Sequence, residues 1–344
     1  MPRQINCTMT GLRTDVPTLQ IDTVPHVYLA DVTEPGRAIF RVSDGDPPWG
    51  ATITFGRQTV RLVIPLGNGA TEGPWLNYPP APVPLERLHV EGTSFVTASG
   101  QPWIWKGCSD FLLYKRFLEG EDLTRLLEER RELGANLLRV FGMLHFIERF
   151  SPKAYRGSYY ESLPLFADLL ALSGFYLEFV TFADQQQIGV VEQTHFVECC
   201  DQLATRPNTF IELCNEYPKN GIDPRHFSKP AEILASAGSA LADAAPDVFW
   251  DFFGWHGRRD WPKVTSSCED MYAVIQQRQI PGVHDEPARQ DRPAEFSPHL
   301  AAQIALTSRL LGSGATFHSI SGLRSQPFTP FELECAHAFF VELT

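Results

Sequence analysis

The side chains best suited to chemistry in this sequence are two glutamates, Glu216 in the segment IELCNEYP and Glu286 in VHDEP. Cleaving a glycosidic bond requires one carboxylic acid that protonates the leaving oxygen and one ionised carboxylate that attacks or stabilises the sugar. A fixed guanidinium beside one carboxyl group separates the two pKa values, and Arg139 in ANLLRVFG is placed to do so. Either glutamate alone would more simply be a solvated loop residue or a salt-bridge partner. The pair, with Asn215 adjacent to Glu216, favours catalysis.

The elements that must position these residues are apolar runs that alternate with helical patterns. We expect seven strands, at 103–107, 137–141, 176–181, 209–214, 248–254, 281–285 and 315–320. This alternation predicts an α/β fold with right-handed crossovers, a (β/α)8 barrel of the TIM type in which one strand is short or missing. An open doubly wound sheet is the competing architecture. Its first strand would normally lead into a glycine-rich phosphate loop, and the sequence has none at that point.

Helix signals lie between the expected strands. Ser228 with Pro230 predicts a helix through ILASAGSALADA (233–244), because an N-cap followed by a proline in the first turn is a typical start. The same signal at Ser297 and Pro298 predicts a second helix.

Polar side chains gather where the expected strands end, which is where barrels of this kind carry their working residues. The positions are Asp110, Arg139, Asp184, Asn215, Glu216, Trp255, His256, His284, Asp285, Glu286 and His318. Such a grouping at one end of otherwise apolar strands is hard to explain as core packing. Trp255 is a candidate platform for the apolar face of a sugar, with core packing as the alternative.

Four segments resemble the cellulase-like clan of retaining glycoside hydrolases, clan A, over about residues 88–344. IELCNEYP resembles the clan's strand-four motif, in which Asn-Glu supplies a substrate-binding amide and the general acid/base. GANLLRVFG is similar to its second strand, whose arginine steadies the nucleophile, and LHVEGTSFVTASGQPWIWKG looks like the hairpin and first strand that open many of its barrels. VHDEP lies where the nucleophile strand belongs.

The resemblance implies hydrolysis of a β-linked poly- or oligosaccharide by double displacement with retention, as in polysaccharide degradation. Glu216 would be the acid/base and Glu286 the nucleophile, while Asn215 would hold the sugar 2-hydroxyl. His256 would contact the nucleophile from the sixth strand. The further substrate-binding candidates are Arg139, Trp255, Asp110, Asp184 and His318.

The sequence also departs from the clan's pattern. Tyr217 separates Asn-Glu from Pro218, and His318 ends the last strand where the clan often has tryptophan. Asp285 replaces Glu286 as the nucleophile if that strand is shifted by one residue, because a two-residue period lets only one of them point inward.

Two other functions remain open. A barrel that kept its fold but lost turnover would bind carbohydrate as a recognition or structural module, because a fold alone does not set function. A lyase or aldolase-like barrel enzyme is the third possibility, but an aldolase-like site needs a lysine at a strand end, and none of the seven strands ends in one. The two glutamates with Asn215 and Arg139 favour the hydrolase.

The composition excludes several classes of protein. The 344 residues include 41 acidic and 29 basic side chains, for a net charge of −12, whereas nucleic-acid and anionic-membrane surfaces need a basic face. No run reaches the roughly 18–20 apolar residues of a membrane span, and the N-terminus lacks the apolar stretch of a secretory signal. The 7 cysteines favour buried, reduced thiols and a reducing, cytoplasmic compartment. We expect a carbohydrate partner, with no nucleic acid and no membrane.

The chain changes character near residue 80. Short β-branched runs separated by turn clusters predict a small sandwich-like antiparallel β domain at 1–80, and the proline-rich segment after it predicts a stiff linker at 81–87. The catalytic barrel takes 88–344. The sequence lacks G-x-S-x-G, H-E-x-x-H, C-x-x-C and the P-loop motif, so we expect no cofactor and no catalytic metal.

Overall fold

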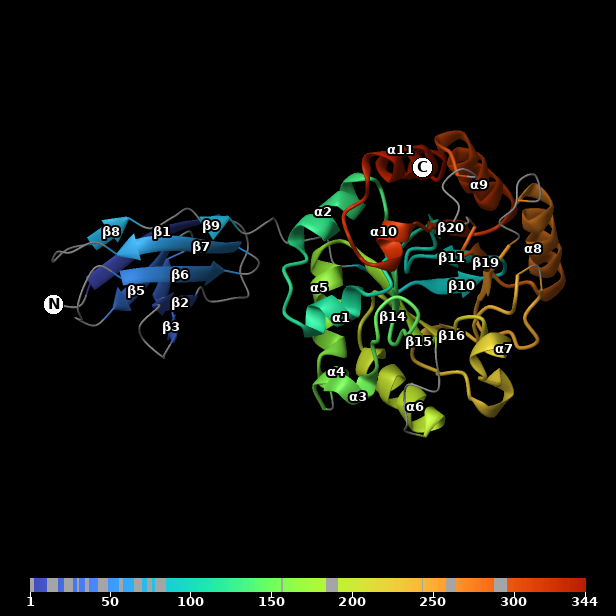
Figure 1. Cartoon of the computed structure of the whole chain (residues 1–344), viewed down its shortest axis with the longest axis horizontal. Coiled ribbons are helices and arrows are strands. Elements are labelled where there is room, and N and C mark those ends of the chain that lie inside the picture. Colours follow the sequence, from blue (N-terminus) through green and yellow to red (C-terminus); the bar gives the residue numbers. More distant parts are fainter. Residues whose placement is uncertain are drawn as a thin grey trace. The chain divides into compact units, whose positions relative to one another are not determined.

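The computed structural model describes nine strands between residues 3 and 77, and residues 85–344 except 156, 184–190, 243, 258–263 and 288–295. The chain divides into two compact units, Met1–Pro84 and Leu85–Thr344, and each is described by itself (Figure 1).

The first unit contains two β-sheets (Figure 1). Its strands are β1 (Arg3–Thr10), β2 (Thr18–Ile21), β3 (Val27–Leu29), β4 (Asp31–Glu34), β5 (Arg37–Val42), β6 (Trp49–Phe55), β7 (Gln58–Ile64), β8 (Ala70–Glu72) and β9 (Leu76–Asn77). One sheet has the order β4-β5-β1-β8, with β9 also paired to β1, and the other has the order β3-β2-β6-β7. Phe40 of β5 and Ile53 of β6 are fully buried.

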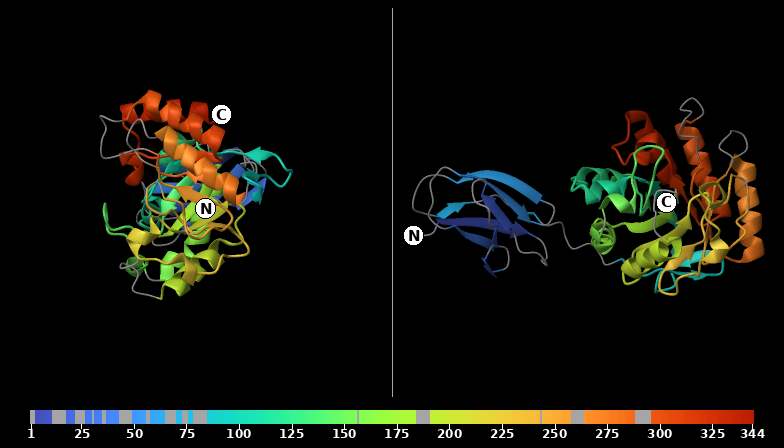
Figure 2. Two further views of the ribbon diagram at one scale, coloured as in Figure 1. Left: turned by 90° about the vertical axis from the view of Figure 1, so that its right-hand side faces the viewer. Right: turned by 60° about the horizontal axis from the view of Figure 1, so that its bottom comes forward.

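The second unit is an eight-stranded parallel barrel flanked by helices (Figures 1 and 2). Its strands are β13 (Trp105–Ser109), β14 (Leu137–Phe141), β15 (Tyr176–Phe182), β16 (Thr209–Cys214), β17 (Leu234–Ser236), β18 (Phe253–Trp255), β19 (Gly282–His284) and β20 (Gly314–Phe317). They follow the order β17-β16-β15-β14-β13-β20-β19-β18, and a single bridge between Ser236 and Phe252 brings the two ends together. The barrel expected from the alternating pattern is confirmed.

Eleven α-helices are described in this unit, most of them in the crossovers between strands. They are α1 (Leu113–Leu118), α2 (Thr124–Glu132), α3 (Pro152–Tyr155), α4 (Gly157–Glu161), α5 (Leu163–Leu172), α6 (Glu192–Leu203), α7 (Tyr217–Asn220), α8 (Val264–Arg278), α9 (Pro298–Leu311), α10 (Ile320–Leu323) and α11 (Pro330–Glu342), and a 3₁₀ turn covers Pro224–His226. The predicted start of α9 is confirmed, because the Ser297 hydroxyl accepts a hydrogen bond from the Leu300 N–H and Pro298 opens the helix.

The barrel strand that was missing from the seven expected ones is β17. It lies where the sequence predicted a helix from Ser228, and that prediction is wrong. Leu234–Ser236 pairs in parallel with β16, and the Asp251 carboxylate accepts a hydrogen bond from the Ala235 N–H. The small side chains that looked helical allow close approach to β16. A Cβ on Gly238 would lie 1.9 Å from the Cys214 carbonyl oxygen, and its φ of +108° is left-handed. Tertiary pairing thus overrides a local helix signal.

A three-stranded antiparallel sheet packs at the end of the barrel where the strands begin. It consists of β10 (His89–Glu91), β11 (Ser94–Val96) and β12 (Pro102–Trp103). Phe95 of β11 is fully buried against the rings of Trp105, Phe210 and Phe252, which stand at or beside the first residues of their strands. This end is filled by aromatic packing, so the opposite end is the one available to a ligand.

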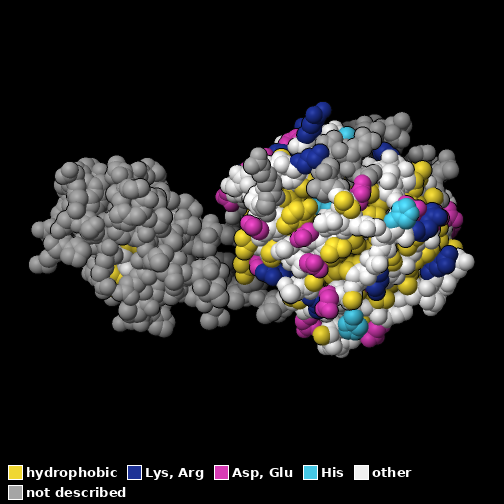
Figure 3. Space-filling view, turned by 90° about the horizontal axis from the view of Figure 1, so that it is seen from below, with side chains coloured by type: hydrophobic (Ala, Val, Ile, Leu, Met, Phe, Trp, Pro, Cys, Tyr) yellow, Lys and Arg dark blue, Asp and Glu magenta, His cyan; other side chains and the backbone are white. Residues whose placement is uncertain are grey.

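The surface in Figure 3 shows apolar side chains in separate patches, with acidic and basic groups between them. Scattered exposed residues such as Leu165, Leu172 and Val197 are normal for a folded protein. Among the described segments, no helix is long and apolar enough to cross a membrane. The described cysteines Cys108, Cys199, Cys200, Cys214, Cys268 and Cys335 are buried free thiols.

Candidate active site

Glu216 stands in a strained turn between β16 and α7. Its backbone is left-handed, with φ 44° and ψ 55°, which is uncommon for a residue with a side chain. The turn is held by the Ser239 hydroxyl, which accepts from the Glu216 N–H at 3.0 Å, and by the Asn220 amide, which donates to the Asn215 carbonyl at 2.6 Å. Strain of this kind persists only where surrounding contacts fix it, and it concentrates at functional sites.

Glu286 follows β19 by two residues and is 5% exposed. Its Oε1 accepts from Nη1 of Arg139 at 3.1 Å, and its Oε2 lies 3.7 Å from Nε2 of His318. The Ser109 hydroxyl lies 2.8 Å from Nδ1 of His318 and orients that ring. Glu286 is therefore fixed by an arginine from β14 and a histidine from the end of β20.

His256, directly after β18, joins the two glutamates. Its Nδ1 lies 3.8 Å from Oε1 of Glu216 and 3.8 Å from Oε2 of Glu286, so these two oxygens are at most twice that distance apart. The imidazole is buried, and neither ring nitrogen has a hydrogen-bond partner among the described residues. Strand ends far apart in the sequence thus bring two carboxyl groups to one imidazole.

Arg139 is the central cation of the site and is fully buried in β14. Its Nη2 donates to Oε2 of Glu212 at 2.8 Å and to Oδ1 of Asn215 at 3.1 Å. Its Nε donates to the same Glu212 oxygen at 3.1 Å and lies 3.4 Å from Oε2 of Glu178. The guanidinium of Arg139 therefore connects β14 to β15, to β16 and to the segment after β19, and it holds both Asn215 and Glu286.

A cavity of about 230 Å³ is lined by both glutamates together with Asn215. Phe111, His145, Phe146 and Lys219 also line it, and Phe146 is 56% exposed. A larger hollow of about 440 Å³ lies between α6 and the segment 226–233, and none of the expected site residues lines it. The smaller cavity is therefore the one that contains the candidate catalytic residues.

The charge state of Glu216 is set by opposing effects. Burial raises its pKa, but His256 and the ammonium of Lys219 outweigh burial and lower the pKa to about 2. Lys219 Nζ lies 2.9 Å from Oε2 of Glu216, within hydrogen-bond distance, whereas His256 is beyond it. Glu216 is therefore ionised at neutral pH in the ligand-free protein.

Two of the expected substrate-binding residues do not line the cavity. Asp110 is fully buried and binds Arg130 of α2 through two contacts of 3.0 and 3.2 Å, so its carboxylate holds a helix and does not line the cavity. Trp255 is 2% exposed, packs with Met271 and Ile275 of α8, and donates to the Ser267 hydroxyl. It points out of the barrel and has no ring face free for a sugar. Asp184 lies outside the described residues.

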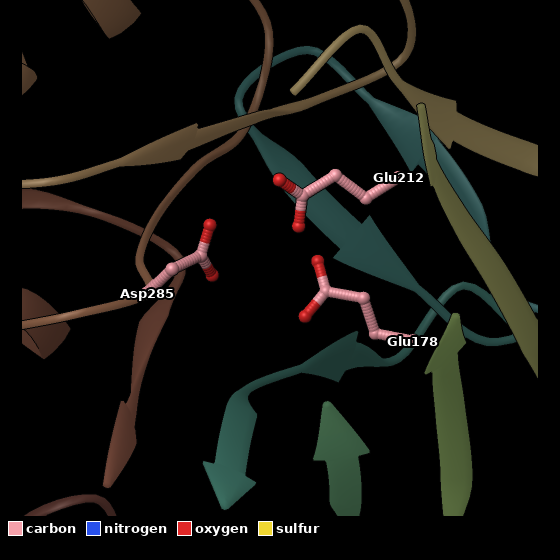
Figure 4. Close-up of side chains that lie close together, drawn as sticks. All are labelled: Glu178, Glu212 and Asp285. Atoms are coloured by element: carbon pink, nitrogen blue, oxygen red, sulfur yellow. The ribbon is translucent and has the colours of Figure 1, made fainter. Parts of the chain in front are cut away.

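Glu286 and Asp285 both point inward, contrary to the expectation that the pleat would admit only one of them. The reason is that β19 ends at His284, so the alternation of the strand no longer applies to the next two residues. Glu286 lines the cavity, whereas Asp285 faces Glu178 and Glu212 in the barrel interior (Figure 4).

Sequence reasoning missed several residues of the site. Phe146 and His145 line the cavity from a segment that carries no motif, and Lys219 lines it from the position directly after IELCNEYP. Glu178 and Glu212 left a readable signal, because a charged residue inside an otherwise apolar strand needs a buried partner. Both are ion-paired with Arg139.

Comparisons with known proteins bear on the fold. No protein-family model matches the chain, and neither does any curated protein. A glycoside hydrolase family 5 protein from Bacteroides vulgatus is similar with a TM-score of 0.52 and 12% identity, over 69% of this chain and 63% of that one. A β-glucanase from Saccharophagus degradans, in complex with cellotetraose, has a TM-score of 0.52 and 11% identity, over 76% of this chain and 94% of that one.

This chain thus spans less than two thirds of the Bacteroides vulgatus protein. At these identities the likeness to the two glycoside hydrolases is one of fold alone.

Proposed function

We propose that this protein is a retaining glycoside hydrolase that cleaves a β-linked poly- or oligosaccharide. The observation that carries the proposal is the placement of Glu216 and Glu286, each with a carboxylate oxygen 3.8 Å from the same nitrogen of His256. A retaining site needs two carboxyl groups about 5–5.5 Å apart, which this placement allows. The cavity beside them supplies room for a sugar.

The reaction would run in two displacements. In the first, a Glu286 oxygen forms a bond to the anomeric carbon, the bond to the leaving oxygen breaks, and Glu216 gives that oxygen its proton. In the second, water attacks the anomeric carbon and gives a proton to Glu216, and Glu286 leaves as a carboxylate. Arg139 and His318 fix the nucleophile, and the Asn215 amide is free to bind the sugar 2-hydroxyl through its NH₂ group.

Two observations support β-linked glucans as the substrate class. Phe146 offers an exposed ring at the cavity, which suits the apolar face of a pyranose. The β-glucanase of similar fold was determined with cellotetraose, so β-linked gluco-oligosaccharides are the first substrates to test.

The test is to incubate the full chain with cellotetraose and with a panel of other β-linked oligosaccharides, and to follow the first-formed anomer by proton NMR. We expect the β-anomer to appear before mutarotation. A first-formed α-anomer would instead establish inversion, and the absence of turnover on the whole panel would contradict the hydrolase.

The second candidate is a barrel that binds carbohydrate without turnover. The observation that favours it is the ion pair of Glu216 with Lys219, because a carboxylate that is ionised at neutral pH cannot donate a proton. Stoichiometric binding of an oligosaccharide by calorimetry, with no hydrolysis over days, would establish this function. The hydrolase requires that substrate binding weaken the effects of His256 and Lys219 on Glu216 and so raise its pKa.

Lys219→Met distinguishes the two candidates through the pH profile. Removing the ammonium raises the pKa of Glu216, so a larger fraction of this acid is protonated near neutral pH. We expect the alkaline limb of kcat/KM to move to higher pH. Lys153→Met, on the exposed side of α3, is the control and should leave the profile unchanged. An unchanged alkaline limb in Lys219→Met would mean that Lys219 does not control the protonation of the general acid.

A further inference from the structure

Three acidic side chains meet inside the barrel, apart from the cavity. Glu178 comes from β15, Glu212 from β16, and Asp285 from the residue after β19, and all three are fully buried. Figure 4 shows their carboxyl groups pointing toward one another. One carboxylate oxygen from each lies within 4.8 Å of the other two.

The positive charge around these three side chains is too small to balance their negative charge if all of them are ionised. A single guanidinium, that of Arg139, interacts electrostatically with four carboxyl groups, those of Glu178, Glu212, Asp285 and Glu286. Fully ionised, the group would carry a net charge of −3 in the barrel interior, and buried charge of that size must be compensated. The guanidinium is already shared among Glu286, Glu212 and Asn215.

A second observation concerns the carboxylate oxygens that accept no hydrogen bond. Both carboxylate oxygens of Asp285, both of Glu178 and Oε1 of Glu212 are inaccessible to solvent and have no hydrogen-bond partner among the described residues. Buried polar atoms are almost always partnered, so these oxygens call for a further positive species between them. They belong to three separate elements, and the three carboxyl groups face one another (Figure 4).

We propose that Glu178, Glu212 and Asp285 hold a divalent cation that prefers oxygen ligands, with calcium as the best match. Hard cations take carboxylate oxygens, and calcium–oxygen distances of about 2.3–2.6 Å place opposite ligands about 4.6–5.2 Å apart. Three oxygens within 4.8 Å of one another are close enough to bind one such ion, and calcium suits an all-protein carboxylate site better than magnesium, which usually keeps several waters. The ion would brace β15, β16 and β19 around Arg139, which in turn fixes Glu286.

The competing occupant is the proton. Burial raises the pKa of Glu178 well above its usual value, the neighbouring Asp285 adds to the rise, and Arg139 opposes it. Burial likewise raises the pKa of Asp285, against the effect of Arg139. Protonation of these two groups would reduce the net charge of the four carboxyl groups and Arg139 from −3 to −1, so a metal must displace protons, and its affinity should rise with pH.

The test uses the full chain after treatment with EDTA, with calcium chloride as the probe and magnesium and manganese chloride for comparison. Elemental analysis after gel filtration should give one calcium per chain. At a calcium concentration of 100 times Kd, the melting temperature should rise by roughly 5 °C over the EDTA-treated protein. Asp285→Asn and Glu178→Gln should each weaken calcium binding at least about tenfold, whereas Glu198→Gln, on the exposed face of α6, should not.

Three results would overturn the proposal. The first is wild-type protein with no stoichiometric divalent ion and the same melting temperature with and without EDTA, which would assign the cluster to protons. The second is calcium binding that persists in Asp285→Asn, which would place the ion elsewhere. The third is a stoichiometric ion that Glu178→Gln retains at full affinity. The measurement is independent of the proposed function, because a barrel without hydrolase activity would bind the ion equally well.

Discussion

Glu216→Gln and Glu286→Gln should each lower kcat/KM on a β-linked oligosaccharide by a factor on the order of 10³ or more. Glutamine keeps the size of each side chain, and at position 286 its carbonyl still accepts from Arg139, so the fold should remain intact. What is lost is a proton at one position and a nucleophile at the other. The measurement is steady-state hydrolysis, with melting temperature and circular dichroism as checks on folding.

An aryl glycoside with a good leaving group separates the two roles. Such a substrate needs little protonation, so Glu216→Gln should recover the first displacement and release a burst of the phenol, whereas Glu286→Gln should stay inactive. Glu198→Gln provides the matched control on the exposed face of α6. Wild-type rates in Glu286→Gln together with an inactive Asp285→Asn would move the nucleophile to Asp285.

The residues at strand ends could be predicted from the sequence because a parallel barrel brings the carboxyl ends of its strands together. Glu216, Glu286, His256 and His318 come from four different strand ends. In the structure, His256 lies 3.8 Å from each glutamate, and His318 lies 3.7 Å from Glu286. Only the order of strands and helices is needed for that inference. The barrel and the spatial grouping of these four residues can therefore be inferred from the order of strands and helices.

What could not be predicted depends on tertiary pairing and on the direction of individual side chains. β17 is three residues long and is made of Leu-Ala-Ser, which carries no β signal strong enough to compete with a helix start at Ser228. Trp255 and His256 are neighbours at the end of β18, yet one packs on α8 and the other faces the glutamates. That choice is set by the barrel's register, which the sequence does not display.

Arg139→Met should lower the free energy of unfolding by about 3–5 kcal/mol, because it leaves buried carboxylates without their cation. Methionine fills similar space, so the loss comes from charge and hydrogen bonding. Equilibrium unfolding in urea measures it. Arg206→Met is the control, because Arg206 pairs with Asp168 at the surface, where such a pair contributes about 0–1 kcal/mol.

The pH dependence of this loss has a definite sign. Glu178 and Asp285 have pKa values raised by burial, which Arg139 opposes, so its removal raises them further. A group whose folded pKa lies above its unfolded value destabilises the fold as pH rises past the unfolded value. The effect of Arg139→Met should therefore be largest at neutral and alkaline pH, and it should shrink as pH falls toward the ordinary values of 4.5 and 3.8, where the unfolded chain is protonated as well. A loss that is small and independent of pH would mean that the interior carboxyl groups are neutral without the arginine, and it would contradict the prediction that Arg139 compensates buried carboxylate charge.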